Sequence, residues 1–322
     1  PVLIKVPDSR FAMAPLSSCF YDNPSERLIV IGVTGTEGKS STVSFIWQLL
    51  NLCGQKAGFI STVEYSFGGP ALPNPQHQTT PEAPIIQSHL NKMLENGCKY
   101  AVVESSSHGL STKLNRCGNI LFDCGVFMNV TLEHLEFHKT FDQYKNDKAN
   151  LFRALDKHNH IKTIAGVPTK INSIGIVNLE DPSYIDFINA TNHHVYGFTS
   201  LGKAGKAAVE NSAPISLPEI PTNTHVMTAT DIVSASDGIS FNISAMDKDS
   251  HFTDESEQTS FSVNAKLPGA FNAYNLMASI IAVSSVTDLS FEQVAAQVPN
   301  VLPIKGRMTV INEGQDFEVI VD

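Results

Sequence analysis

The segment LIVIGVTGTEGKSST, residues 28–42, constrains the fold of this chain more than any other stretch. An apolar run over residues 28–33 leads into a turn rich in Gly and Thr, and apolar residues then recur at helical spacing over residues 43–50. The free N–H groups of such a loop and the positive end of the helix dipole both favour an anion. The segment therefore predicts a strand, an anion-binding loop and a helix.

The residue types in the loop indicate that the anion is a phosphate. Lys39 can reach terminal phosphates, and Ser40 offers a hydroxyl to a magnesium ion. The usual P-loop pattern has a glycine where this chain has Val33, and Gly35 supplies a glycine two residues later. The alternative is a glycine-rich turn that occurs by chance, and the placement between strand and helix argues against it.

Composition excludes several classes of protein. The chain has 322 residues, of which 42% are hydrophobic and 17% charged, as in an ordinary globular protein, and it is long enough for more than one domain. Its formal net charge of -10 makes nucleic acid or an anionic membrane an unsuitable partner. We find neither a bilayer-spanning apolar run nor a signal peptide. Because its five cysteines lack metal-type spacing, we expect free thiols in a cytoplasmic protein.

Residues 28 to about 155 alternate between strand and helix patterns, which predicts an α/β fold of the P-loop type, with a mostly parallel sheet flanked by helices. Two later segments, 239–243 and 261–265, alternate apolar and polar residues and predict a small antiparallel sheet. We expect loops at 200–223 and 247–257. Residues 1–27 form a separate tail with a short helix from Asp8 to Ala14 and a turn-rich linker, and the main domain spans 28–322.

Three motifs could carry chemistry along the edge where the parallel strands end. Glu104 follows a buried strand, where it could hold a divalent cation or cap a helix. The run EHLEFH at 133–138 suits a metal or a proton relay, or forms a polar loop with surface histidines. Lys148 lies on an apolar helix face, where it is either buried and paired or modified, or extends to water.

Three further motifs each have a ligand-binding and a structural interpretation. Thr79 and Thr80 could bind a ligand or cap the next helix, and the capping role is favoured when the motif is taken alone. Asn272 and Asn275 could contact a base or act as caps. Residues 305–307 could bind phosphate or form a surface turn. For the last two motifs as well, the structural interpretation is favoured when each is taken alone.

Taken together and in order, these motifs resemble the Mur ligase family, most closely the type that adds the third amino acid to UDP-N-acetylmuramoyl-dipeptide. The resemblance covers nearly the whole chain and is carried by TGTEGKS at 34–40, TTP at 79–81, ESSSH at 104–108, NVTLEHLEFH at 129–138, KANLF at 148–152, GAFNAYN at 269–275, GRM at 306–308 and VIVD at 319–322. The family has a UDP-binding N-terminal domain, a central ATPase domain and a C-terminal domain. The resemblance implies that residues 1–27 are a remnant of the first domain with a linker, and that residues 28–322 are the central domain.

The resemblance also implies a role for each matching residue, with ATP and Mg²⁺ as cofactors. Lys39 would act on the phosphates, and Glu104, His134 and Ser40 would hold magnesium. Lys148 matches a lysine whose carbamate serves a second magnesium ion; Lys39, His134 and Lys148 would thus be catalytic. The nucleotide would contact Gly35, Thr36, Gly38, Lys39, Ser40, Ser41, Asn272, Asn275, Arg307 and Asp322. The muramoyl-peptide would contact Thr79, Thr80, Ser106 and Arg116.

The family's activity would be ATP-dependent, ADP-forming ligation of an amino acid to UDP-N-acetylmuramoyl-L-Ala-D-Glu through an acyl phosphate, in peptidoglycan precursor synthesis. We expect a monomer. The chain departs from the family pattern at Glu37, which replaces an asparagine, at Glu133 and Glu136, which replace aspartates, and around 110–116, which is two residues longer. Two alternatives remain: a folylpolyglutamate- or cyanophycin-type ligase of the same superfamily, and a nucleotide-binding module without ligase activity.

Overall fold

The computed structural model describes residues 3, 5–76, 78–200, 224–246, 258–304, 306, 309–311, 313–317 and 319–321. The expected loop at 247–257, nearly all of the one at 200–223, and the predicted site residues Arg307 and Asp322 lie outside these residues. No helix in the described part is both long and apolar enough to cross a membrane.

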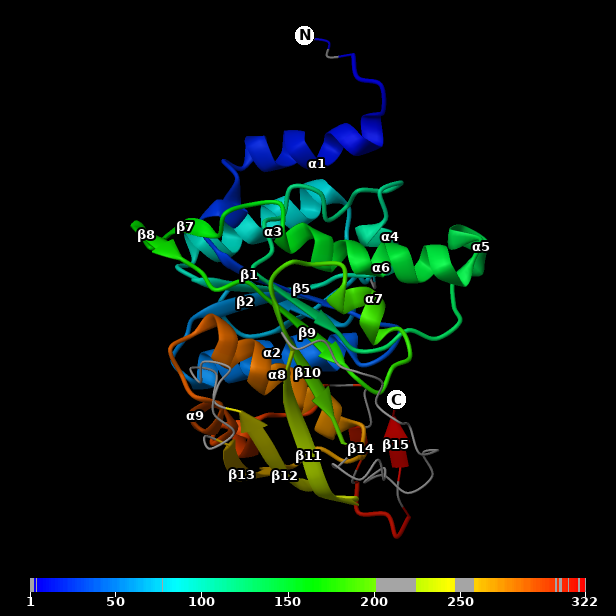
Figure 1. Cartoon of the computed structure of the whole chain (residues 1–322), viewed down its shortest axis with the longest axis vertical. Coiled ribbons are helices and arrows are strands. Elements are labelled where there is room, and N and C mark those ends of the chain that lie inside the picture. Colours follow the sequence, from blue (N-terminus) through cyan, green and yellow to red (C-terminus); the bar gives the residue numbers. More distant parts are fainter. Residues whose placement is uncertain are drawn as a thin grey trace.

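One 11-stranded sheet organises the chain, in the order β13-β12-β11-β10-β9-β6-β1-β5-β2-β3-β4 (Figure 1). Its parallel part comprises β2 (Ala57–Ile60), β5 (Tyr100–Glu104), β1 (Ile29–Thr34), β6 (Cys124–Phe127), β9 (Ile174–Asn178), β10 (His194–Thr199) and β11 (Thr224–Ala235). The antiparallel strands are β12 (Gly238–Met246) and β13 (Gln258–Ala265) at one edge, and β3 (Glu64–Ser66) and β4 (Leu72–Pro73) at the other. The predicted mostly parallel α/β sheet is confirmed, and the two segments predicted to be antiparallel, 239–243 and 261–265, lie in β12 and β13, which continue the main sheet through β11.

Two pairs of short strands lie apart from this sheet: β7 (Ile161–Ile164) with β8 (Val167–Lys170), and β14 (Thr309–Ile311) with β15 (Val319–Val321).

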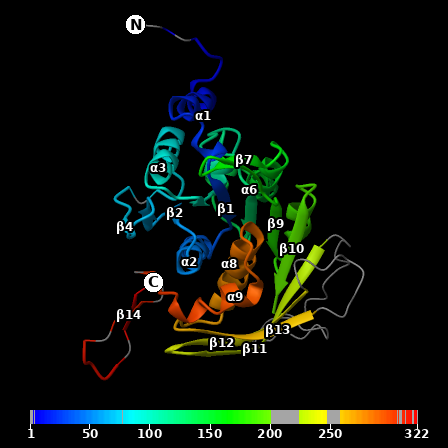
Figure 2. The ribbon, with the colours of Figure 1, turned by 90° about the vertical axis from the view of Figure 1, so that its left-hand side faces the viewer.

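Helices cover both faces of the sheet. One face carries α2 (Lys39–Leu52), α8 (Asn272–Val286) and α9 (Phe291–Ala295), with the 3₁₀ turn η2 (Val298–Asn300) beside β13. The other carries α3 (Ala83–Glu95), α6 (Phe141–Leu155) and α7 (Tyr184–Ile188). Figure 2 shows the sheet curving so that β11–β13 pass beneath α8 and α9. Each helical layer buries its own apolar cluster against the sheet, and this burial is the main stabilising term.

Close packing fixes the position of the strand that leads into the P-loop. Gly32 lies in the middle of β1, where an added Cβ would come within 2.5 Å of Leu151 on α6. The helix that carries Lys148 is therefore pressed directly onto the backbone of β1. This contact places the lysine next to the loop that follows the strand.

The tail before the sheet differs from the prediction at one point. Asp8 caps α1 as expected, but α1 extends over Ser9–Phe20, through Pro15. A proline inside a helix leaves the carbonyl four residues earlier without its partner. Here the freed Phe11 carbonyl accepts a hydrogen bond from Asn115 Nδ2 at 3.1 Å. The 3₁₀ turn η1 (Pro24–Glu26) then leads into β1.

Two short helices lie beyond the carboxyl ends of β5 and β6. These are α4 (Ser107–Leu110), capped by the Ser106 side chain, and α5 (Leu135–His138). They bring the predicted motifs at 104–108 and 129–138 to the same edge of the sheet as the P-loop.

Candidate active site

The loop between β1 and α2 is held open by its own backbone and by one side chain. Gly38 has a φ of +77°, and an added Cβ would lie 2.7 Å from Asn275 Oδ1, so glycine is needed there. Asn129, just after β6, accepts hydrogen bonds through Oδ1 from the N–H groups of Thr36 (3.0 Å) and Glu37 (2.8 Å). Its Nδ2 donates to the Glu37 carbonyl at 3.2 Å. The loop conformation is thus fixed by a neighbouring strand end.

A pocket of about 460 Å³ opens at this loop. It is lined by Thr36, Glu37, Gly38, Lys39, Ser40, Ser41, Phe45, Thr62, Thr79, Glu104, Glu133, Leu267, Pro268, Phe271, Asn272, Asn275, Pro303 and Ile304. One side of the pocket is polar and carries the loop and the ends of the strands. The other side is largely apolar and comes from residues 267–271 and 303–304. Such a combination suits a ligand with a charged end and an apolar ring.

A buried carboxylate lies at the polar side. Both oxygens of Glu104 are 3.0 Å from Ser40 Oγ, and the carboxylate also accepts hydrogen bonds from Thr62 N (2.8 Å) and Thr62 Oγ1 (3.1 Å). Burial raises the pKa of Glu104, while Lys39 and these hydrogen bonds oppose the rise. Glu104 does not cap α4, because Ser106 does; the capping alternative is wrong.

Two lysines approach the loop from different helices. Lys39 Nζ donates to the Thr36 carbonyl at 2.7 Å. Lys148 on α6 is 2% exposed, and its Nζ donates to the Gly35 carbonyl at 2.5 Å. Burial, followed by the charge of Lys39, lowers the pKa of Lys148 well below its usual value, whereas Glu133 and Glu104 raise it. Of the two alternatives for Lys148, the structure shows the buried, inward-facing one, and the alternative that extends to water is wrong.

The donor atoms at the polar side fit a magnesium ion. The Ser40 hydroxyl and the Glu104 carboxylate are hard oxygen ligands of the kind that Mg²⁺ prefers. A buried carboxylate whose pKa is raised by desolvation regains its charge most readily beside a cation. Ser40 and Glu104 are therefore the residues best placed to hold the ion.

His134 lies at a different place from these oxygens. It is the N-cap of α5 with a φ of +55°, its side chain is 47% exposed, and it pairs with Glu136 at 3.4 Å and Glu133 at 3.8 Å. Glu133 lines the pocket, whereas His134 does not. The second histidine of the motif, His138, is buried. The motif is therefore not simply a loop with surface histidines.

The predicted acceptor-binding residues form a connected group beside Glu104. Thr80 Oγ1 donates to the Glu104 carbonyl and accepts from the Ser106 N–H, both at 2.8 Å. Arg116 donates to the Thr80 carbonyl at 3.2 Å and pairs with Glu82 at 2.6 Å. The expectation that these threonines cap the next helix is wrong, because Glu82 is the N-cap of α3, without a side-chain bond.

Asn272 and Asn275 lie in the first turn of α8 and line the pocket. Asn272 Nδ2 donates to the Pro268 carbonyl at 2.7 Å, and Asn275 Nδ2 donates to Asn272 Oδ1 at 3.0 Å. The N-cap of α8 is Phe271, so neither asparagine acts as the cap.

Several pocket residues were not predicted. Phe45, Thr62, Leu267, Pro268, Pro303 and Ile304 belong to none of the motifs, and Phe271, within the motif at 269–275, was not singled out. Thr62 could have been found, since it lies just beyond the carboxyl end of β2, which runs parallel to β5 and ends beside Glu104. Asn129 begins the motif at 129–138, but its contact with the P-loop depends on tertiary structure and gives no local signal.

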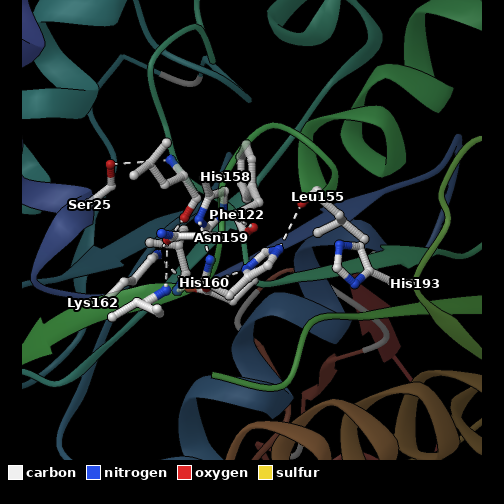
Figure 3. Close-up of polar contacts among 12 residues, drawn as sticks. Ser25, Phe122, Leu155, His158, Asn159, His160, Lys162 and His193 are labelled. Carbon is white, nitrogen blue, oxygen red and sulfur yellow. Dashed lines mark hydrogen bonds and ion pairs between the residues drawn. The ribbon is translucent and has the colours of Figure 1, made fainter. Parts of the chain in front are cut away.

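A second polar cluster lies at the amino ends of the parallel strands, opposite the ends that carry the pocket (Figure 3). Asp123, His158 and His160 lie close enough to hold a metal ion. However, buried Lys162 donates to Asp123 Oδ2 (2.5 Å) and to the carbonyls of Leu28 (2.9 Å) and Leu121 (2.6 Å).

The ring nitrogens of this cluster are also engaged. His160 bonds to Asp123 Oδ1 (3.1 Å) and the Leu155 carbonyl (2.7 Å), and His158 Nε2 donates to the Phe122 carbonyl (2.8 Å). The lysine already neutralises the carboxylate, so this cluster ties the starts of β1 and β6 to the end of α6.

A family model for the Mur ligase middle domain matches residues 33–283. This chain belongs to the Mur ligase family. The matched range of this Mur ligase chain includes the P-loop, Glu104, Lys148 and most of α8, and it ends before the pocket residues Pro303 and Ile304.

Relatives with assigned names agree with this placement. The UDP-N-acetylmuramyl-tripeptide synthetase of Treponema denticola is 49% identical over 99% of this chain and 54% of its own length. The UDP-N-acetylmuramoyl-L-alanyl-D-glutamate–2,6-diaminopimelate ligase of Geobacillus kaustophilus is 32% identical over 100% of this chain and 56% of its own length. The MurF ligase of Thermotoga maritima, solved in complex with ADP, has the same fold, with a TM-score of 0.59 at 17% identity over 97% of this chain and 56% of its own. The chain thus spans about half the length of these relatives.

Proposed function

We propose that this chain is the ATP-binding part of a ligase that adds an amino acid to UDP-N-acetylmuramoyl-L-Ala-D-Glu in peptidoglycan precursor synthesis. The observation that carries the proposal is the convergence of Lys39, Ser40, Glu104 and Lys148 on one P-loop. The names of the relatives support the same acceptor class.

In this proposal the loop amides and Lys39 bind the phosphates of ATP, and the apolar side of the pocket together with Asn272 and Asn275 receives the base. Mg²⁺, held by Ser40 and Glu104 with His134 as a further candidate ligand, would supply positive charge at the phosphates. The main contribution of the chain is to position the reactants and neutralise charge.

The acceptor carboxylate attacks the γ-phosphorus, the bond to the β-phosphate oxygen breaks, and ADP leaves. The resulting acyl phosphate is attacked by the amine of the incoming amino acid, which loses a proton as phosphate departs and the amide forms. Thr79, Thr80, Ser106 and Arg116 would hold the acceptor, since they lie beside Glu104.

The environment of Lys148 suits carbamylation. Because burial lowers its pKa, the amine is more readily neutral and able to attack CO₂, forming an N–C bond and releasing a proton. The product carries a negative charge beside Lys39, which would favour it. Under this proposal, residues 28–322 act as the central domain of a cytoplasmic, monomeric enzyme.

The test is phosphate release by the full-length protein with ATP, Mg²⁺ and UDP-N-acetylmuramoyl-L-Ala-D-Glu. We expect release that requires both the acceptor and one amino acid. Glu37, an acidic residue lining a phosphate pocket, favours one rival, a nucleotide-binding module without turnover. That rival predicts ATP binding but no phosphate release with any acceptor. Phosphate release with a folate-type acceptor would instead indicate another ligase of the superfamily.

A further inference from the structure

The segment 131–140 carries pocket residue Glu133 and candidate ligand His134, and it inserts one buried side chain into the protein. Its other contacts include the hydrogen bond from the Thr131 N–H to Thr36 Oγ1 (2.9 Å) and ring contacts of His134 and Phe137 with His108. Its residues are all described, and His138 is the single buried one among them, at 3% exposed. The short helix α5 within it is flanked by two residues with positive φ, His134 (+55°) and Lys139 (+71°). Such a conformation is costly for residues other than glycine and persists where contacts enforce it.

The buried side chain of His138 supplies those contacts. Its Nδ1 is 2.7 Å from Asp147 Oδ2, and its Nε2 is 3.0 Å from Ser107 Oγ. Asp147 is 5% and Ser107 2% exposed. An ionised Asp147 only accepts, so Nδ1 carries the proton and Nε2 accepts the Ser107 hydroxyl. Both bonds are protected from water, and losing either leaves a buried polar group unpaired.

The two partners lie on the elements that carry the other site residues. Asp147 directly precedes Lys148 on α6, and Ser107 follows acceptor-binding candidate Ser106 at the start of α4. Tyr144 extends the connection, because its ring packs 5.1 Å from that of His138 and its hydroxyl lies 3.1 Å from Thr36 Oγ1 in the P-loop. One imidazole thus joins three segments that end at the pocket.

We propose that His138 is a positioning residue that, through Asp147 and Ser107, holds segment 131–140 so that Glu133 faces the pocket and candidate ligand His134 stays next to it. Ser107 is too buried to act as a nucleophile, so the serine–histidine–aspartate arrangement serves geometry instead of hydrolysis. The inference rests on the proposed function for its effect on turnover. Its structural part, the attachment of the segment, stands on the contacts alone.

The test compares four variants of the full-length protein. His138→Ala removes both bonds, His138→Asn keeps a donor near Nδ1 for Asp147, and Ser107→Ala removes only the hydroxyl contact. His158→Ala is the matched control, because it removes a partly buried histidine bond to the Phe122 carbonyl at the amino ends of the parallel strands.

The first readout is hydrogen exchange of the amides of Phe137, His138 and Lys139, which bond within segment 131–140. The second is Mn²⁺ binding, as a probe for Mg²⁺, in the presence of a non-hydrolysable ATP analogue. The third is the Mg²⁺ concentration that gives half-maximal ADP formation.

In His138→Ala we expect faster exchange confined to this segment. We also expect the Kd for Mn²⁺ and the Mg²⁺ concentration for half-maximal ADP formation to rise by about tenfold or more, as when an outer-shell partner of a metal site is lost. His138→Asn and Ser107→Ala should show smaller changes in the same direction, and His158→Ala none. Folded His138 variants with wild-type exchange and wild-type Mn²⁺ binding would overturn the proposal.

If His138→Ala does not fold, the milder His138→Asn and Ser107→Ala decide by the same criteria. If the protein without any substitution forms no ADP, the proposed function fails. Hydrogen exchange and Mn²⁺ binding would still test the role of His138.

Discussion

Asn129 fixes the P-loop through its side-chain amide, and replacing it with alanine tests whether loop geometry governs nucleotide affinity. Asn129→Ala removes the acceptor for the N–H groups of Thr36 and Glu37 and the donor to the Glu37 carbonyl. These bonds are partly solvated, so each contributes about 0.5 kcal/mol. Thr36 N keeps a second bond, to the Asn129 carbonyl at 2.9 Å. The total of about 1.5 kcal/mol for the three bonds corresponds to about tenfold weaker binding.

The assay is calorimetric titration of the full-length protein with MgADP, alongside thermal unfolding. We expect the Kd to rise about tenfold with little loss of stability, because the freed N–H groups at the loop can be hydrated. Asn178→Ala is the control: Asn178 ends the neighbouring strand and bonds to the Met128 carbonyl at 2.9 Å and the Glu180 N–H at 3.0 Å, outside the pocket. An unchanged Kd in Asn129→Ala, or an equal rise in the control, would refute the reasoning.

Three further predictions follow from burial and charge. Glu104→Gln removes a buried carboxylate, and burial raises the pKa of that group. ADP formation should fall at least a hundredfold, while the free energy of unfolding at pH 7 should rise by about 1 kcal/mol. That gain should shrink as the pH falls and the wild-type carboxyl protonates, and a loss of stability in thermal unfolding would contradict it. Gly32→Ala should lower the free energy of unfolding in urea by about 1–3 kcal/mol, because the new Cβ meets Leu151 at 2.5 Å; an unchanged midpoint would show that α6 can shift freely. Burial, followed by the charge of Lys92, lowers the pKa of His89 to about 4. The stability that neutral His89 contributes is therefore fully present above about pH 6.5 and is lost as the pH falls towards 4. His89→Gln should therefore make the fall in the free energy of unfolding between about pH 6.5 and pH 4 smaller by about 1–2 kcal/mol. Identical curves of stability against pH for the two proteins would contradict this.

The elements that the sequence predicted are those with a local signal. The strand, loop and helix at 28–50 are specified by short apolar runs and glycines, and the structure has β1, the P-loop and α2 there. The position of Lys148 on an apolar helix stripe made burial one of two alternatives, and the structure shows the buried one. The carboxyl-end rule for parallel strands brought Glu104 to the same end of the sheet as the P-loop.

The features that the sequence did not predict depend on partners distant in the chain. β11 buries His225, Met227 and Ala229 on one face, and because a histidine and an alanine stand at two of these positions, the apolar alternation is hidden. Helix α1 continues past Pro15 because a side chain about 100 residues away bonds the freed carbonyl. The bonds of His138 to Asp147 and Ser107 likewise exist only once three segments meet.

The central claim is that the pocket lined by Lys39, Ser40 and Glu104, with Lys148 bonded to the same P-loop, supports ligation onto a muramoyl-dipeptide. The most direct measurement is phosphate release by the full-length protein with ATP, Mg²⁺ and UDP-N-acetylmuramoyl-L-Ala-D-Glu across a panel of amino acids. The account predicts release that depends on the acceptor and on one amino acid, and that Lys39→Ala abolishes. Measurable ATP binding without phosphate release for any amino acid would contradict it.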